Sequence, residues 1–296
     1  MTGAAGRRLT RNRRSAMITW GLVLPVLLVM AAFALAPIGA MTEASFHRSE
    51  FGIIQPGFTL RNYTQILLSP VYFEIYWKTI AAAAAVVVVC GVLGYPVAMA
   101  IVAAPAKYRP TLYFLVAASL LINTVVRTYG WLLVLGRTGV VNQTLIMLGI
   151  IDEPLKLTGN YLGLIIGSAQ VFLPFMILSL AASLQKIDRR LFESAEILGA
   201  SRWRRFRTIT LPLSLPGLLS GSVLVFSLML GAFVNPILLG GSAIKYLSVS
   251  VYTDALVLFN LPRAIALSMV LLAIVVFIFA LQRYLTNRAK RFQVES

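Results

Sequence analysis

The chain has 296 residues, of which 59% are hydrophobic and 12% are charged. Because soluble globular proteins carry about 25% charged residues, this composition disfavours a soluble enzyme, a disordered chain and a coiled coil. The 26 Lys and Arg residues outnumber the 10 Asp and Glu residues, for a formal net charge of +16. In so apolar a chain, this excess indicates basic loops on the cytoplasmic side of a membrane rather than nucleic-acid binding.

Six apolar runs are long enough to cross a bilayer, because a hydrocarbon core of about 30 Å is spanned by about 20 helical residues. We predict helical spans at about 17–41, 79–104, 111–135, 160–184, 213–235 and 263–283. They form one transmembrane domain over 17–285, between a basic tail at 1–16 and a second tail at 286–296. The predicted fold class is therefore all-α and polytopic.

Two of the runs allow more than one interpretation. The first follows a basic start, as the apolar part of a signal peptide does, but 17–41 is long for one and favours an uncleaved span. The fifth charge-free run, Thr208–Ile244, is longer than one span and has Pro and Gly residues near both ends. Since Pro and Gly mark helix ends, we predict one helix followed by a non-helical segment on the far side.

The distribution of basic residues predicts the orientation. In the six-span topology, 18 Lys and Arg residues lie in the two tails and in the loops after the second and fourth spans, whereas 7 lie on the opposite side. The positive-inside rule therefore places both termini in the cytoplasm. On the outer side we predict a short helix at about 60–77, lying on the membrane, where packing of the outer rim is favoured over a docking role.

The loop between the fourth and fifth spans carries the most information. It reads KIDRRLFESAEILGASRWRRFRTITLP from Lys186 to Pro212. Leu191, Ala195 and Leu198 recur at helical spacing, and Gly199 is a helix stop, with a second short helix expected at 203–208. Such a helix-break-helix indicates a protein partner, but its composition fits a solvated basic loop equally well.

A motif in this loop resembles that of the permease subunits of bacterial ABC importers. The family pattern is E-A-A, three residues, G, nine residues, I, one residue, L-P. The corresponding residues are Glu193, Ser194, Ala195, Gly199, Ile209, Leu211 and Pro212, with Ser for Ala as the one departure. The resemblance implies a type I ABC importer permease fold, in which this loop is the coupling helix that docks on an ATP-hydrolysing subunit.

Two further segments resemble the spermidine/putrescine permease group of that family. VRTYGW at 126–131, followed by GVVN at 139–142, matches the third-span signature, and FLPFM at 172–176 is similar in the fourth span. The resemblance implies ATP-driven polyamine uptake across a bacterial inner membrane. Because the group also contains permeases for other small solutes, another small organic solute is the alternative.

No stretch of the chain fits the phosphate-binding pattern G-x-x-x-x-G-K-[ST], so we expect no ATP site, no other cofactor and no metal site in this chain. The resemblance implies a second permease subunit, usually a different but related chain. It also implies two ATPase subunits and a periplasmic solute-binding protein, around a core that contacts the lipid bilayer. The chain itself is expected to perform no covalent chemistry.

Candidates for the solute pathway are fewer and less specific. Arg127 is the one formal charge deep in a predicted span, where it either lines the pathway or pairs with a backbone carbonyl. Tyr129 and Trp131 are candidates for cation–π contact with an amine, although aromatic residues at a helix end commonly form the interfacial belt. The remaining candidates are Asn235, Tyr252 and Asp254.

Two other classes of protein stay open at this point. A stand-alone channel or secondary transporter commonly places paired charges or broken helices at the middle of the membrane, and only Arg127 and a few prolines favour it here. A non-transporting scaffold or receptor subunit is the second rival.

Overall fold

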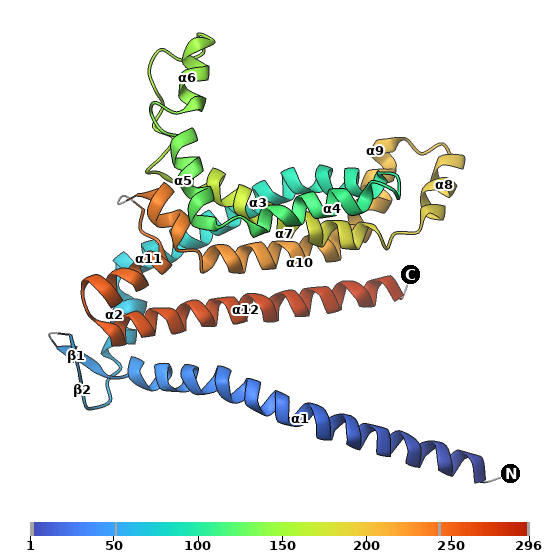
Figure 1. The fold of residues 1–296 in the computed structure, drawn as a ribbon, viewed down its shortest axis with the longest axis horizontal. Coiled ribbons are helices and arrows are strands. Elements are labelled where there is room, and N and C mark those ends of the chain that lie inside the picture. Colours follow the sequence, from blue (N-terminus) through green and yellow to red (C-terminus); the bar gives the residue numbers. More distant parts are fainter. Residues whose placement is uncertain (1–2, 51, 242–243, 295–296) are drawn as a thin grey trace.

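A computed structural model describes residues 3–50, 52–241 and 244–294 of the chain (Figure 1). The helices are α1 Gly3–Ser45, α2 Arg61–Leu68, α3 Pro70–Ala103, α4 Arg109–Ala118, α5 Thr124–Val134, α6 Val140–Met147, α7 Tyr161–Leu184, α8 Arg189–Ile197, α9 Arg202–Arg205, α10 Leu211–Leu230, α11 Leu247–Tyr252 and α12 Leu261–Val294. Strands β1 Arg48–Glu50 and β2 Ile53–Gln55 form an antiparallel hairpin that pairs Arg48 with Gln55. Three segments are π-helical: Phe206–Thr210 after α9, Pro236–Gly240 between α10 and α11, and Thr253–Val257 after α11. The all-α fold is therefore confirmed.

The core of the bundle is the packing of α3, α7 and α10 around one another. Glycines permit the close approach of these helices: a Cβ at Gly94 of α3 would lie 3.3 Å from the side chain of Met176 on α7. A Cβ at Gly217 of α10 would lie 2.9 Å from the backbone carbonyl of Ser179 on α7. Because lipid offers no hydrophobic drive for association, such small residues let van der Waals packing hold membrane helices together.

The outermost helices are α1 and α12. α12 packs on α10, and α1 packs on α12. Within Val23–Ser45 of α1, the most apolar stretch of 18 residues contains no buried residue. Figure 1 shows α1 diverging from the bundle toward its N-terminus, so that both chain ends lie at the same end of the molecule as α8 and α9. β1, β2 and α2 lie at the opposite end.

The expected third span at 111–135 is present as two helices instead of one continuous helix. α4, extended by a 3₁₀ turn at Ser119–Leu121, and α5 are bent by 90°. At the bend Ile122 is extended (ψ 128°), and Asn123 begins α5 by accepting a hydrogen bond from the Val125 N–H at 2.8 Å. The side-chain cap competes with a continuous helix, because Asn favours helix starts over helix interiors. Among the residues that the structure describes, five other helices are long and apolar enough to cross a membrane, so the spans there number six when the bent pair counts as one.

Several helix boundaries also differ from those expected. The predicted surface helix at 60–77 is divided, because Ser69 is extended before Pro70, where a proline disfavours the helical conformation of the preceding residue. α3 therefore begins at Pro70 rather than at 79, and α10 ends at Leu230 rather than at 235. The expected tails are largely helical, since α1 begins at Gly3 and α12 continues to Val294.

Candidate functional site: a loop at one end of the bundle and a polar chain beside the broken span

Residues 186–212 form consecutive helical pieces at the end of the bundle where both termini lie (Figure 1). α8 begins after Asp188, whose carboxylate accepts a hydrogen bond from the Arg190 N–H at 2.9 Å. It closes at Gly199, whose φ is +73° and whose N–H donates to the Glu196 carbonyl at 2.9 Å. The predicted helix stop at Gly199 is confirmed, and glycine suits it because positive φ carries no Cβ penalty there.

The end of α8 and the start of α9 expose an apolar ridge. Ile197 is 86% exposed, Leu198 85% and Trp203 69%. Of the predicted amphipathic stripe, Leu191 is also exposed, whereas Ala195 is half-buried. Large apolar side chains gathered on one exposed loop are typical of a protein-interaction surface.

The motif residues divide between the exposed helix and the return into the bundle. Glu193 and Ser194 are exposed on α8, Ile209 lies in the π-helical segment, and Leu211 and Pro212 are the first two residues of α10. Glu193 and Glu196 also line a cavity of about 480 Å³ beneath α8, whose other walls come from the ends of α3 and α7 and the start of α4. α8 is therefore held away from the bundle at one side.

The loop is anchored to the core through residues that the sequence analysis missed. The hydroxyls of Tyr95 on α3 and Ser214 on α10 share a buried hydrogen bond of 2.6 Å. The Tyr95 ring meets Phe206 edge to face at 5.5 Å between centroids, and Phe206 stacks on Trp203 at 5.5 Å. A continuous series of contacts thus leads from the exposed ridge to two core helices. The sequence signal that could have revealed this anchor is Tyr95, a tyrosine inside an otherwise apolar span.

Arg127 lies just after the bend between α4 and α5. Its Nη2 donates to the carbonyl of Ser119 at 2.5 Å and to that of Ile122 at 2.9 Å. Both carbonyls lie in the last turn of the first piece or directly after it, where carbonyls commonly need partners from outside the helix. Of the two interpretations of Arg127, pairing with backbone carbonyls is the one present in this structure, and it ties the guanidinium to the bend.

A buried chain of polar side chains lies next to Arg127. Thr128 Oγ1 donates to Asn235 Oδ1 at 2.7 Å, and Asn235 Nδ2 donates to Ser168 Oγ at 3.1 Å. On the same helix, Trp131 Nε1 donates to Gln170 Oε1 at 3.2 Å, while Tyr129 is exposed. The structure therefore brings two candidates, Trp131 and Asn235, to the contact between α5 and α7, whereas Arg127 is bonded at the bend. Thr128, Ser168 and Gln170 were missed.

Tyr252 lies in α11 and packs against Phe233, with the two rings tilted by 36° and 4.8 Å between their centroids. Tyr246, just before α11, is fully buried and donates its hydroxyl to the Met229 carbonyl at 2.6 Å. Burial raises the pKa of the Tyr246 phenol, which therefore stays neutral and serves as a hydrogen-bond donor.

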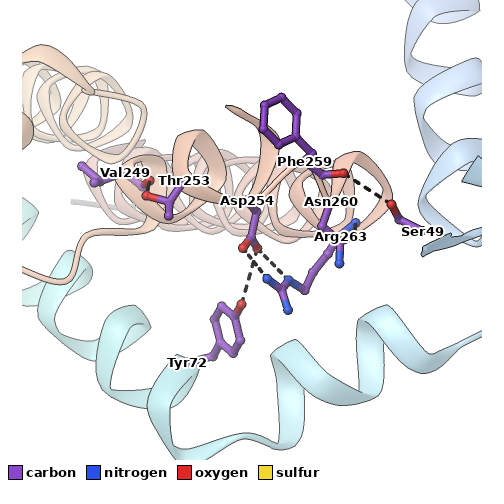
Figure 2. A network of polar contacts seen from close by, with 8 residues as sticks. All are labelled: Ser49, Tyr72, Val249, Thr253, Asp254, Phe259, Asn260 and Arg263. Carbon is purple, nitrogen blue, oxygen red and sulfur yellow. Dashed lines mark hydrogen bonds and ion pairs between the residues drawn. The ribbon is translucent and has the colours of Figure 1, made fainter. Parts of the chain in front are cut away.

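Asp254 belongs to a different cluster from the other candidates. Figure 2 shows its carboxylate between Arg263 and Tyr72. Arg263 Nε and Nη2 donate to it at 2.9 and 2.6 Å, and the Tyr72 hydroxyl donates at 3.4 Å. Because the carboxylate is buried and already bonded to an arginine, it is occupied in fastening the π-helical segment Thr253–Val257 to α12 and α3.

Multiple apolar spans around a tightly packed helical core, with an exposed helix-break-helix loop at one end, are the features of a multi-pass membrane protein. The chain belongs to the family described as binding-protein-dependent transport system inner membrane component, whose model matches residues 92–291. It is a permease subunit of an ABC importer and a multi-pass inner-membrane protein.

Similar proteins include two permeases with named substrates. The chain is 35% identical over 233 residues to the spermidine/putrescine transport system permease protein PotB of Haemophilus influenzae, covering 78% of this chain and 81% of the relative. It is 37% identical over 195 residues to PotB of Escherichia coli K12, covering 66% and 70% of the two chains. A solved bacterial alginate ABC transporter, in complex with an alginate pentasaccharide-bound periplasmic protein, superposes with a TM-score of 0.74 at 20% identity. That match covers 95% of this chain and 98% of the other, and it shows a shared fold.

Proposed function

We propose that this chain is a permease subunit of a polyamine importer. The observation that carries the substrate class is the 35% identity with a permease named for spermidine and putrescine, extending over 78% of this chain. The third-span residues 126–131 and 139–142, which resemble the same group, lie at the break in that span and beyond it. Another small organic solute is the second candidate.

The importer would contain four further components: a second permease that is a different but related chain, two ATPase subunits and a periplasmic solute-binding protein. The motif from Glu193 to Pro212 supports an ATPase partner, because this loop exposes a short helix and an apolar ridge at the end of the bundle. ATP hydrolysis would take place in that partner. The periplasmic protein seen with the alginate transporter supports the same kind of partner here.

Both termini and the loop from 186 to 212 would face the cytoplasm. The support is that 18 of the 26 Lys and Arg residues lie in segments assigned to this side, where a negative surface potential favours them. The chain ends and α8 share one end of the molecule, as this orientation requires (Figure 1).

Closure of the ATPase pair would push on α8. The movement would be transmitted to the spans through the contacts that join the loop to α3 and α10. Phe206 meets Tyr95, and Tyr95 is bonded to Ser214, so movement of the loop would displace α3 and α10 together. The Gly199 and Ala200 N–H groups donate to the carbonyls of Glu196 and Ala195, at 2.9 Å each, and Arg205 of α9 pairs with Glu196 of α8 at 2.8 Å. These contacts would hold α8 and α9 at a defined angle, so that the loop moves as a unit.

The solute pathway would run along α5, beside the broken span. Tyr129 is exposed there and Trp131 is half-buried, and aromatic faces attract ammonium groups without a tight ion pair. A weak site suits import, because tight binding would slow release. Arg127 would stabilise the bend, and Tyr252 remains a candidate lining residue, whereas Asp254 would act as a structural fastening between helices.

Uptake into membrane vesicles tests the proposal. Vesicles that contain the chain, its partner permease, the ATPase and the binding protein should accumulate labelled spermidine only with ATP. Omission of this chain should abolish accumulation, whereas uptake that survives its omission would favour a scaffold or receptor role. Transport without the ATPase would instead establish a channel or secondary transporter. ATP-driven uptake of an amino-acid-like solute, with no response to spermidine, would establish the second candidate.

A further inference from the structure

A basic cavity lies at the end of the bundle opposite the coupling loop. It has a volume of about 250 Å³ and is lined by three arginines, Arg48, Arg61 and Arg263, with Ser49, Asn62, Gln65 and Asn260. The arginines come from three elements that are distant in sequence: β1, α2 and α12. Neither the coupling motif nor the candidates along α5 contribute to it, so the transport role leaves this cavity unexplained.

Hydrogen bonds hold the elements that carry the arginines in fixed positions. Asn62 is buried, and its Nδ2 donates to the carbonyls of Ser45 at 2.8 Å and His47 at 2.9 Å, which places the first turn of α2 beside β1. Ser49 Oγ donates to the carbonyl of Phe259 at 3.4 Å and joins β1 to the chain before α12 (Figure 2). The cavity is therefore built by the fold rather than formed by three independent surface side chains.

The side chains that line the cavity carry a net positive charge. Arg263 forms an ion pair with Asp254, whereas Arg61 forms no ion pair within the described part of the chain. The N-termini of two helices also meet here, because Arg61 begins α2 and Asn260 accepts a hydrogen bond from the Arg263 N–H in the first turn of α12, at 3.3 Å. Helix N-termini add a partial positive charge to that of the guanidinium groups.

The cavity lies at the boundary of the membrane-spanning region. Arg48 follows the apolar segment Val23–Ser45 of α1 by three residues, and Arg263 is the third residue of the apolar segment Leu261–Tyr284 of α12. Lipid phosphates occupy this depth, just outside the hydrocarbon core. A second cavity of about 430 Å³ continues from the first, sharing Gln65 and Arg263 and reaching Leu68, which is 79% exposed.

We propose that this cavity binds the phosphate of an anionic phospholipid, in the leaflet at this end of the bundle. Guanidinium groups hold phosphate oxygens in paired hydrogen bonds, which a cluster of arginines from three elements permits. The depth of the cavity and the exposed apolar side chain beside it favour a lipid over a free anion, because a lipid satisfies both the basic and the apolar parts. The bound headgroup braces the β-hairpin, α2 and α12. In the proposed orientation the leaflet is the outer one.

Native mass spectrometry of the assembled transporter, titrated with phosphatidylglycerol or phosphatidylcholine, tests the proposal. The variant Arg48→Gln/Arg61→Gln removes two positive charges and leaves the Asp254–Arg263 pair intact. Its affinity for phosphatidylglycerol should fall about thirtyfold, with little change for phosphatidylcholine. The matched control is Arg137→Gln/Lys156→Gln, which removes two exposed positive charges assigned to the same side but outside the cavity, and it should bind like the original chain. Arg48→Lys/Arg61→Lys, which keeps the charge, should recover part of the affinity.

Three results would overturn the proposal. One is equal binding of phosphatidylglycerol by the original chain and by Arg48→Gln/Arg61→Gln, with both assembled. Another is release of bound lipid by millimolar inorganic phosphate, which would make the cavity a site for a free anion. The third is unchanged lipid binding combined with weaker docking of the solute-binding protein in the Arg48→Gln/Arg61→Gln variant, which would assign the arginines to an acidic protein surface.

Discussion

Thr128 and Asn235 are joined by a buried hydrogen bond of 2.7 Å across 107 residues of sequence. Thr128 lies in α5 after the 90° bend, and Asn235 precedes the π-helical segment that follows α10. Because Asn235 is bonded in turn to Ser168 of α7, the pair fixes the second half of the broken span against the core. The position of the proposed solute pathway thus depends on neutral polar side chains.

Replacing Thr128 by Val should therefore weaken the attachment of α5. The substitution keeps the shape of the side chain but leaves Asn235 Oδ1 buried without its donor, which costs about 1–3 kcal/mol. We expect a lower free energy of unfolding of the purified transporter and reduced uptake in vesicles. Thr144→Val on α6, where the exposed hydroxyl bonds only to the carbonyl one turn before it, is the control and should change neither. Equal stability of the two variants would contradict the fastening role.

Arg127→Ala should reduce uptake while the subunits still assemble. The substitution removes the donor to the carbonyls of Ser119 and Ile122, so the bend between α4 and α5 loses its side-chain brace. Arg127→Lys keeps a positive donor but has a single nitrogen, and it should retain part of the activity. Uptake and co-purification of the subunits measure the two effects. Unchanged uptake by Arg127→Ala would leave the residue without a role in transport.

Gly199→Val should uncouple ATP hydrolysis from transport. A β-branched residue at a φ of +73° carries strain of about 1–3 kcal/mol, which the loop relieves by changing the angle between α8 and α9. Membrane insertion should persist, because no atom outside the immediate chain lies within 4 Å of a Cβ there. The matched control is Gly149→Val, which has a φ of +68° and equally open surroundings but lies after α6. ATP hydrolysis and uptake are measured together, and normal coupling in Gly199→Val would count against the coupling-helix assignment.

Gly217→Ala should lower stability, whereas Gly91→Ala should not. At Gly217 an added Cβ lies 2.9 Å from the Ser179 carbonyl, so α10 must move away from α7, at a cost of about 1–3 kcal/mol. At Gly91 the nearest atom is Leu218 Cδ1 at 3.8 Å, an ordinary contact, and the higher helix propensity of Ala should preserve or raise stability. Thermal unfolding in detergent distinguishes the two. A stability loss at Gly91 equal to that at Gly217 would argue against close helix approach as the cause.

The membrane-spanning helices and the helix-break-helix form of the loop at 186–212 were predictable from local sequence. A charge-free run of about 20 residues has few alternatives to a transmembrane helix, because lipid cannot satisfy exposed backbone groups. The helix stop at Gly199 was equally local, since it depends on the conformational freedom of one residue. The bend in the third span was less visible, because 111–135 is apolar almost throughout and the Asn123 cap is a small local signal.

The partners of the polar side chains were decided only by the tertiary structure. Arg127, Asn235 and Asp254 stood out in the sequence as pathway candidates, but each finds its hydrogen-bond partners on other turns, loops or helices. The arginines of the basic cavity come from β1, α2 and α12, and no local sequence pattern predicts that these elements lie together. Hydropathy determines where the chain crosses the membrane, because it sums over neighbouring residues. Which polar groups are satisfied by the protein, and which remain free for a solute or a lipid, depends on contacts between residues far apart in the chain.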